Sequence, residues 1–313
     1  MKEKTLKQIA NMKKHTIGVE VEMNNIKRSE AAKLASRYFE TGRYENTERR
    51  NGYETFSAWD EKGREWKFQK DVSIAGVESE KCELVTPILT YDDIELLQGL
   101  LRALRKAGAK SDAKRGCGVH IHIGADGHTA STLRNLANLM RSHEELITKA
   151  LNIDKGRIER FAKTVNDDFI KEINDKKPQS MRKLSDIWYE TNRATNGRNN
   201  HYNSSRYHML NLHSTFTKGT IEFRLFEFDS PKDGKQNGIH AGQLKSYIQL
   251  CLALSQMAKD SKFSSPKPQQ VENPKYAMRT WLLRLGFVGD EFKTARSFLT
   301  KNLQGDASFR DGR

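Results

Sequence analysis

The chain has 313 residues, of which 36% are hydrophobic, so it can bury a core and is not wholly disordered. No apolar run approaches the roughly 20 residues of a membrane span, and the charged N-terminus lacks the apolar centre of a secretory signal. Lysine and arginine (54) outnumber aspartate and glutamate (40). The resulting net charge of +14 favours an anionic partner and does not exclude nucleic acid.

Three cysteines are far apart in the sequence and form no CxxC pair. This spacing argues against a disulfide framework and against a structural zinc site, and it is typical of a reducing cytoplasm. The prediction is therefore a cytoplasmic protein that does not span a membrane.

The first half of the chain contains both strand and helix signals. In order, we predict a strand over 15–23, a helix over 29–40, a hairpin over 52–71 that turns at 61–63, a strand over 81–89, and a helix over 90–108 that starts with a Thr90–Asp93 capping box.

The second half is richer in helix. We predict a strand over 116–124, helices between 129 and 190, an Asn-rich loop over 192–205, a strand pair over 206–216 and 219–229, a long helix over 238–260, and a helical extension about 273–303. Strands occur early, in the middle and late without regular alternation, which disfavours a doubly wound sheet. The prediction is one α+β domain over 1–313 with its core about 15–260, a mostly antiparallel sheet and a helical insertion near 129–190.

The stretch IGVEVEM alternates apolar residues with two glutamates. Because residues i and i+2 of a strand point to the same face, Glu20 and Glu22 share a face opposite the apolar residues. Two later strands repeat this design: GVHIHIG presents His120 and His122, and TIEFRLF presents Glu222 and Arg224.

Taken singly, each pair has an ordinary explanation. An ExE strand is most often a solvated sheet face, an HxH strand often holds packing histidines, and an EFR strand usually forms a cross-strand ion pair. If the three pairs share one face, their carboxylates repel one another strongly, and divalent cations are the simplest compensation.

The ligand types indicate the metal. Carboxylates with an imidazole and no clustered thiolates suit Mg²⁺ or Mn²⁺, and Arg206 and Arg224 are suited to neutralise phosphate charge. The chain has no GxxxxGK[ST] loop and no GxGxxG after a strand. A bound nucleotide must therefore be held by the sheet and its metals.

The segments IGVEVEM, KFQKDVSI, CELVTPIL, GCGVHIHIG, RYHMLNLH and GTIEFRLFE, in this order over about 15–230, resemble the glutamine synthetase-like carboxylate–amine ligases. More closely, the chain is similar to the amidoligase family of that group, typical of bacteria and their mobile elements. The resemblance implies a curved, mostly antiparallel sheet with helices on its convex side. The concave face would hold ATP, two or more Mg²⁺ or Mn²⁺ ions, and the acid to be activated.

The resemblance also implies residue roles. The metal ligands would be Glu20, Glu22, Glu83, His120 and Glu222. Arg224 would face the transferred phosphoryl group, Arg206 would be a second anion contact, and Asp71 would be an acidic or substrate-contacting residue. The remaining nucleotide or substrate contacts would be His122 and Asn211.

The implied reaction is ATP-dependent amide formation. A carboxylate attacks the γ-phosphate of ATP to give an acyl phosphate, and an amine then displaces phosphate. The positive charge favours an acidic small molecule, peptide or polymer as the acid, and the family is compatible with an oligomer. The loop over 192–205 is a candidate substrate lid, or an ordinary surface loop.

Two other readings stay open at this point. A His-hydrophobic-His strand also occurs in metal-dependent nickases that cut single-stranded DNA through a tyrosine. That function agrees with the net charge but leaves Glu20, Glu22 and the Glu222–Arg224 pair unexplained. The other alternative is a non-catalytic binding module on the ligase fold.

Overall fold

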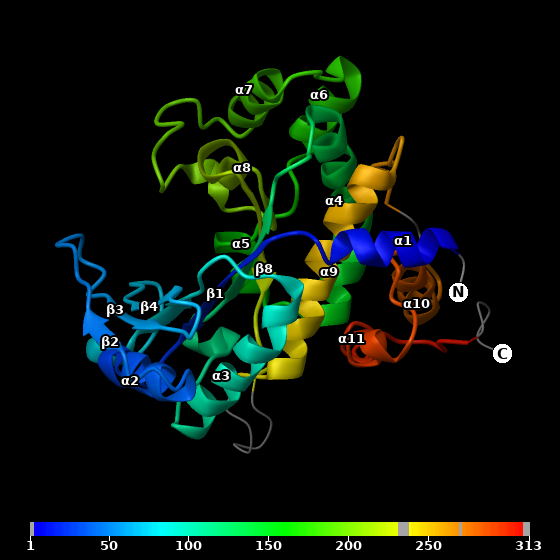
Figure 1. The fold of residues 1–313 in the computed structure, drawn as a ribbon. Helices are drawn as coiled ribbons and strands as arrows, with labels where there is room; N and C mark the ends of the chain where they lie inside the picture. The colour runs from blue at the N-terminus through cyan, green and yellow to red at the C-terminus, as the bar shows by residue number, and fades with distance from the viewer. Residues whose placement is uncertain (1–2, 231–237, 269–270, 309–313) are drawn as a thin grey trace. The chain divides into compact units, whose positions relative to one another are not determined.

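The computed structural model describes residues 3–230, 238–268 and 271–308, and the chain divides into two compact units (Figure 1). The first unit comprises residues 1–15, 122–225 and 246–313, and the second comprises 16–121 and 226–245. Strand β6 (Val119–Gly124) continues from the second unit into the first. A single catalytic domain over the whole chain stays a prediction.

The second unit is built on antiparallel strands. These are β1 (Ile17–Met23), β2 (Tyr44–Asn46), β3 (Phe56–Trp59), β4 (Glu65–Gln69) and β5 (Cys82–Val85), in the order β2-β3-β4-β5-β1 and followed by β6. The predicted strands at 15–23 and 81–89 and the predicted hairpin within 52–71 are confirmed.

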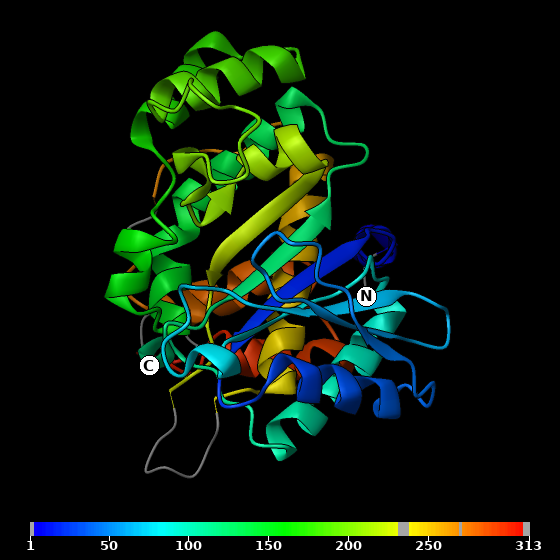
Figure 2. The ribbon, with the colours of Figure 1, turned by 90° about the vertical axis from the view of Figure 1, so that its left-hand side faces the viewer.

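Register decides which side chains share a face of this sheet. Glu83 is directly opposite Glu22 on one side and Gln69 on the other, so these three side chains project from the same face. The opposite face carries the buried apolar partners Leu84 and Phe68. Helices α2 (Arg28–Tyr38) and α3 (Ile94–Lys106) lie on one side of these strands, and α2 packs on β3 and β4 (Figure 2).

The start of α3 confirms the predicted capping box. The side chain of Thr90 accepts from the backbone of Asp93, and the Asp93 carboxylate accepts from the backbone of Thr90. The first turn is a 3-10 turn, η2 (Tyr91–Asp93). Asp93 also forms ion pairs with Arg64 at 2.8 Å and Lys62 at 3.0 Å, which tie this helix to the β3–β4 turn.

The first unit is mainly helical. Its helices are α1 (Glu3–Met12), α4 (Ala130–Leu151), α5 (Lys155–Arg160), α6 (Asp167–Lys176), α7 (Met181–Thr191), α8 (His213–Lys218), most of α9 (Ala241–Asp260), α10 (Pro274–Arg284) and α11 (Lys293–Phe298). Helices α4 to α7 confirm the helical insertion near 129–190, and α10 and α11 lie within the range predicted for the C-terminal extension.

The strands of the first unit are β7 (Leu210–Asn211) and β8 (Thr220–Phe226), which pair antiparallel with Asn211 opposite Glu222, and β8 neighbours β6. The described residues thus hold eight strands, and every register that defines a pair of them is antiparallel. This confirms the α+β class.

The prediction of a strand over 206–216 was wrong. Only Leu210 and Asn211 pair with β8, and the HSTFTK segment forms helix α8. Gly219 ends that helix in the left-handed region, at φ +72°, so it is a helix cap and not the turn of a hairpin. Helix α1 and edge strand β2 were not predicted. Among the described residues, no helix has the length and apolarity that crossing a membrane requires.

Candidate active site

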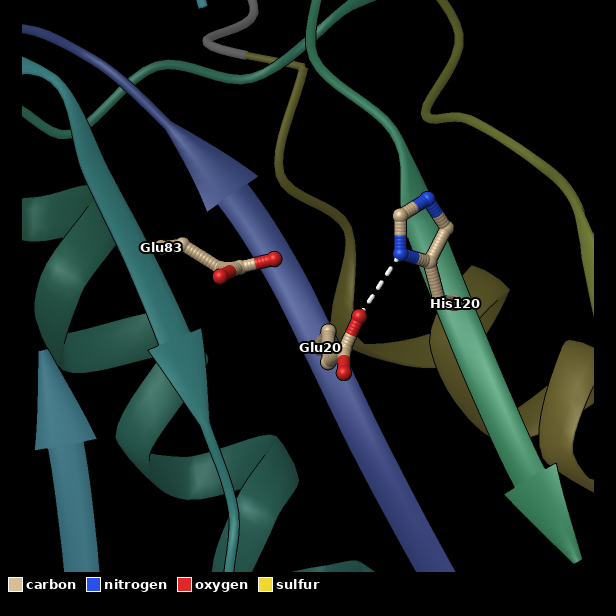
Figure 3. A group of neighbouring side chains, drawn as sticks. All are labelled: Glu20, Glu83 and His120. Atoms are coloured by element: carbon tan, nitrogen blue, oxygen red, sulfur yellow. Dashed lines mark hydrogen bonds and ion pairs between the residues drawn. The ribbon is translucent and has the colours of Figure 1, made fainter. Parts of the chain in front are cut away.

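A cluster of carboxylates and one imidazole occupies the polar face of the second unit. Glu20 on β1, Glu83 on β5 and His120 on β6 point toward one another (Figure 3), and each offers a ligand atom within 4.8 Å of the other two. Glu22, Asp71 and Glu83 form a second such group. The two groups share Glu83, so four carboxylates and one histidine gather at one place.

His120 is held by two glutamates of β1. Its Nδ1 lies 2.8 Å from Oε2 of Glu20, and its Nε2 lies 3.8 Å from Oε1 of Glu22. Because an ionised carboxylate only accepts hydrogen bonds, Nδ1 carries the proton of the neutral ring. In this tautomer Nε2 carries the lone pair and is the ring atom that can bind a metal, while Glu20 orients the ring. The backbone N–H of Gly118 donates to Oε2 of Glu22 at 2.5 Å and fixes that carboxylate.

Glu83 is the buried carboxylate that the two groups share. Its side chain accepts a hydrogen bond from Nε2 of Gln69 at 2.8 Å. Burial raises the pKa of Glu83 well above its ordinary value, and the negative charges of Glu20, Glu22 and Asp71 raise it further. Metal-free, the cluster therefore favours a protonated Glu83.

Asp71 joins the cluster from the loop after β4. One of its oxygens, Oδ1, accepts from the backbone N–H of Ser73 at 2.7 Å and from its hydroxyl at 2.6 Å. This local turn aims the carboxylate toward Glu22 and Glu83. Several carboxylate oxygens with one imidazole are a hard donor set, so the residues present fit a divalent cation such as Mg²⁺ or Mn²⁺.

A second cluster lies in the first unit and centres on Glu222 of β8. Arg224 Nη1 lies 2.5 Å from Oε1 of Glu222, and Nδ2 of Asn211 donates to Oε2 at 2.6 Å. His122 Nε2 lies 3.9 Å from the same Oε1, and its Nδ1 lies 3.0 Å from the hydroxyl of Thr220. The predicted residues Glu222, Arg224, Asn211 and His122 are thus neighbours in the structure.

Asn211 adds an unused acceptor to this cluster. Its side chain is 1% exposed, and no hydrogen bond reaches its Oδ1 within the described parts of the chain. A buried amide oxygen without a donor is costly unless a ligand supplies one. This atom is therefore a candidate contact for a substrate donor or a metal-bound water.

Arg206 lies elsewhere in the first unit. It ends the 3-10 turn η4 (Ser204–Arg206), and its guanidinium lies over the rings of Tyr202 and Tyr207 at 5.6 and 5.8 Å. The guanidinium of Arg224 also lies over the ring of Tyr207, at 5.8 Å. Arg206 is therefore linked to Arg224 through a tyrosine and belongs to the loop that precedes β7.

The loop over 192–205 has internal order. Asn203 is buried and its Nδ2 lies 3.1 to 3.2 Å from the carbonyls of Ala194, Asn196 and Gly197. Its Oδ1 accepts from the backbone and hydroxyl of Ser205. Sequence reasoning missed this role, although an asparagine within an Asn-rich loop is a residue that commonly caps turns.

Sequence reasoning also missed Gln69, Gly118 and Tyr207. Gln69 and Gly118 reach the carboxylates only through cross-strand register, which no local pattern reveals. Tyr207 follows Arg206 directly in the sequence, and an Arg–Tyr pair beside a proposed anion contact could have drawn attention to it.

A family model described as "Putative amidoligase enzyme" matches residues 13–255. No curated protein matches the chain. Among solved structures, the crystal structure of a bifunctional glutathione synthetase from Pasteurella multocida matches with a TM-score of 0.43 and 14% identity, over 96% of this chain and 49% of that one. The chain thus spans about half the length of that protein. Because the family model covers more than half of the 313 residues, the chain belongs to this amidoligase family.

Proposed function

We propose that the protein is an ATP-dependent carboxylate–amine ligase that forms an amide or peptide-like bond through an acyl phosphate. The observation that carries this proposal is the gathering of Glu20, Glu22 and Asp71 around Glu83, with His120 beside Glu20. Membership of the amidoligase family supports it. We also propose that the antiparallel strands form the curved sheet typical of carboxylate–amine ligases.

The reaction has two steps. A carboxylate oxygen of the acid attacks the γ-phosphorus of ATP, the bond to the β,γ-bridging oxygen breaks, and ADP leaves. The amine nitrogen then attacks the acyl carbon, phosphate leaves with the electron pair of the C–O bond, and the amine loses a proton to solvent. No protein nucleophile is needed, so positioning and electrostatics supply the catalysis.

The carboxylates and imidazole of the first-described cluster would hold the divalent ions, with Glu222 as a further ligand. The ions, when bound, neutralise phosphate oxygens and polarise the γ-phosphoryl group. Arg224 would neutralise charge that develops on that group, and its contact with Glu222 and Tyr207 keeps its side chain in place. His122 and Asn211 would contact nucleotide or substrate, and Arg206 would be a second anion contact.

The test is divalent-dependent binding of a non-hydrolysable ATP analogue, followed by ADP release with panels of acids and amines. We expect Glu22→Gln to abolish Mn²⁺ binding, and Arg224→Gln to lower turnover about 10²- to 10³-fold while Mn²⁺ still binds. Glu45→Gln is the matched control, because Glu45 is an exposed glutamate of β2 whose register places it on the same sheet face. If the analogue does not bind at any Mg²⁺ or Mn²⁺ concentration, the ligase assignment is wrong.

A further inference from the structure

The stretch of sequence that precedes Glu222 contains no acidic residue. From 191 to 221 there is no aspartate or glutamate, although the segment holds Arg193, Arg198, Arg206 and Lys218. This charge bias stands out because aspartate and glutamate (40 of 313 residues) are distributed along most of the remaining sequence. A locally uncompensated positive segment attracts an anionic ligand.

The structure shows how part of this segment is connected to Arg224. The guanidinium of Arg206 lies between Tyr202 and Tyr207, and Tyr207 is shared with Arg224. The Nη1 of Arg206 also donates to the carbonyl of His201 at 3.1 Å. Cation–π contacts and this hydrogen bond hold the arginine in place without neutralising it.

Lys163 lies beside Tyr207, because the two backbones are hydrogen-bonded. Its backbone N–H donates to the carbonyl of Tyr207 at 3.0 Å, and its carbonyl accepts from Met209 at 2.7 Å. The Lys163 side chain is exposed. Across the described residues, no carboxylate pairs with Lys163 or Arg206, whereas Arg198 is paired with Asp186 at 2.5 Å.

We propose that Lys163, Tyr202, Arg206 and Tyr207, here named the basic strip, bind carboxylates of an acidic peptide that is the acid substrate. The inference rests on the proposed ligase function, because it places the reacting carboxylate of that peptide at Arg224. The peptide's other carboxylates then form charge-assisted hydrogen bonds with Arg206 and Lys163.

The spacing fits a peptide. The guanidinium carbons of Arg206 and Arg224 each lie 5.8 Å from the centre of the Tyr207 ring. The two guanidinium groups are therefore separated by at most twice that distance. An extended peptide rises about 3.3 Å per residue, so a carboxylate about two or three residues from the reacting one reaches Arg206. A monoacid would leave Arg206 and Lys163 without a ligand.

The strip is poorly suited to single-stranded nucleic acid. Binding of bases needs successive free aromatic faces, on which the bases stack. Tyr207 already contacts two guanidinium groups, and Tyr202, although 58% exposed, contacts the Arg206 guanidinium and the His201 ring. The observations therefore favour an acidic peptide over an oligonucleotide.

The test measures binding without nucleotide, on the full chain. Fluorescein-labelled hexaglutamate, hexaglutamine and oligo-dT are titrated by fluorescence anisotropy at low and high salt. We expect hexaglutamate to bind with an affinity that falls with salt, and hexaglutamine and oligo-dT to bind at least tenfold more weakly. Tighter binding of oligo-dT, or equal binding of hexaglutamine, overturns the proposal.

Two substitutions locate the site. Arg206→Gln and Lys163→Gln should each weaken hexaglutamate binding about three- to tenfold, the effect of one partly exposed charge-assisted contact. Arg182→Gln and Lys183→Gln remove matched exposed charges from α7 of the same unit and should leave binding unchanged. Equal losses in all four variants would indicate a general charge effect and overturn the assignment. Lys163 is exposed, so its variant tests the strip even if Arg206→Gln alters folding.

ATP-analogue binding separates this inference from the proposed function. If wild-type protein binds hexaglutamate but no analogue, the ligase function fails and the anion-binding strip stands without its catalytic role. If the analogue binds and hexaglutamate does not, the substrate inference fails. If Arg206→Gln weakens analogue binding and spares hexaglutamate, Arg206 is a nucleotide contact and the inference is overturned.

Discussion

Replacing Glu83 by glutamine should stabilise the metal-free protein and remove its response to divalent ions. Glu83 is buried, and its pKa is raised by burial and by the charges of Glu20, Glu22 and Asp71. No cation pairs with its side chain in the described residues. Glutamine has the same shape and can still accept the hydrogen bond from Gln69.

The size of the effect follows from distance. Glu83 offers a ligand atom within 4.8 Å of those of Glu20 in one group and of Glu22 and Asp71 in the other, and two unit charges at that separation repel by about 3 kcal/mol at an effective dielectric constant of about 20. Protonation limits the loss, so we expect a gain of about 1–3 kcal/mol at pH 8, or about 2–10 °C in melting temperature. Because the folded pKa lies above the ordinary value of 4.5, the penalty grows as pH rises from that value. The gain should therefore shrink toward zero near pH 5.

Thermal melts in EDTA and in saturating Mn²⁺, at pH 5 and pH 8, measure these differences. Wild-type protein should melt higher with Mn²⁺, and Glu83→Gln should melt higher than wild type in EDTA with little further rise on adding Mn²⁺. Glu45→Gln, exposed on the same face, should behave as wild type. A lower melting temperature for Glu83→Gln in EDTA at pH 8 would show that the carboxylate is a structural acceptor, and would refute the idea of uncompensated charge.

Three further outcomes test other parts of the structure. Burial raises the pKa of Glu144 to about 7. Glu144→Gln should therefore raise the free energy of unfolding by about 1–2 kcal/mol at pH 8 and by almost nothing near pH 4.5. Urea titrations at both pH values measure this difference. Asp93→Asn should lower stability by about 2–4 kcal/mol through loss of the Arg64 ion pair and part of the capping box, and the exposed neighbour Asp92 gives the control Asp92→Asn. Asn203→Ala should speed tryptic cleavage in the loop over 192–205, because three carbonyl contacts are lost; an unchanged cleavage rate would contradict that role.

Local pattern was sufficient to predict the elements that carry the site. The alternation around Glu20 and around His120 predicted strands with one polar face, and both strands are present. The pairing of Glu83 with Glu22 and Gln69 could not be predicted, because register depends on contacts between distant segments.

The segment before β8 shows the limit of propensity. Residues 213–218, HSTFTK, contain threonines and a phenylalanine, which favour strands. They nevertheless form α8, whose Thr217 hydroxyl donates back to the carbonyl of His213 and whose end is capped by Gly219. Because the strand is shorter than its pattern suggests, Arg206 lies in a turn and not on the sheet.

The two clusters differ in charge balance, and this difference supports separate tasks. In the second unit, Glu20, Glu22 and Asp71 gather around Glu83, with one imidazole beside Glu20, an arrangement that a divalent cation would stabilise. In the first unit, Glu222 is already paired with Arg224, and the basic strip beyond it adds positive charge. Under the proposed function, the first cluster would bind cations together with Glu222, and Arg224 and the basic strip would bind anions. A ligase that activates a carboxylate with ATP needs both, because it must hold phosphate oxygens through metal ions and keep an anionic acid beside them. A nickase with two histidines on one metal has no comparable need for four carboxylates, so charge distribution favours the ligase over that alternative.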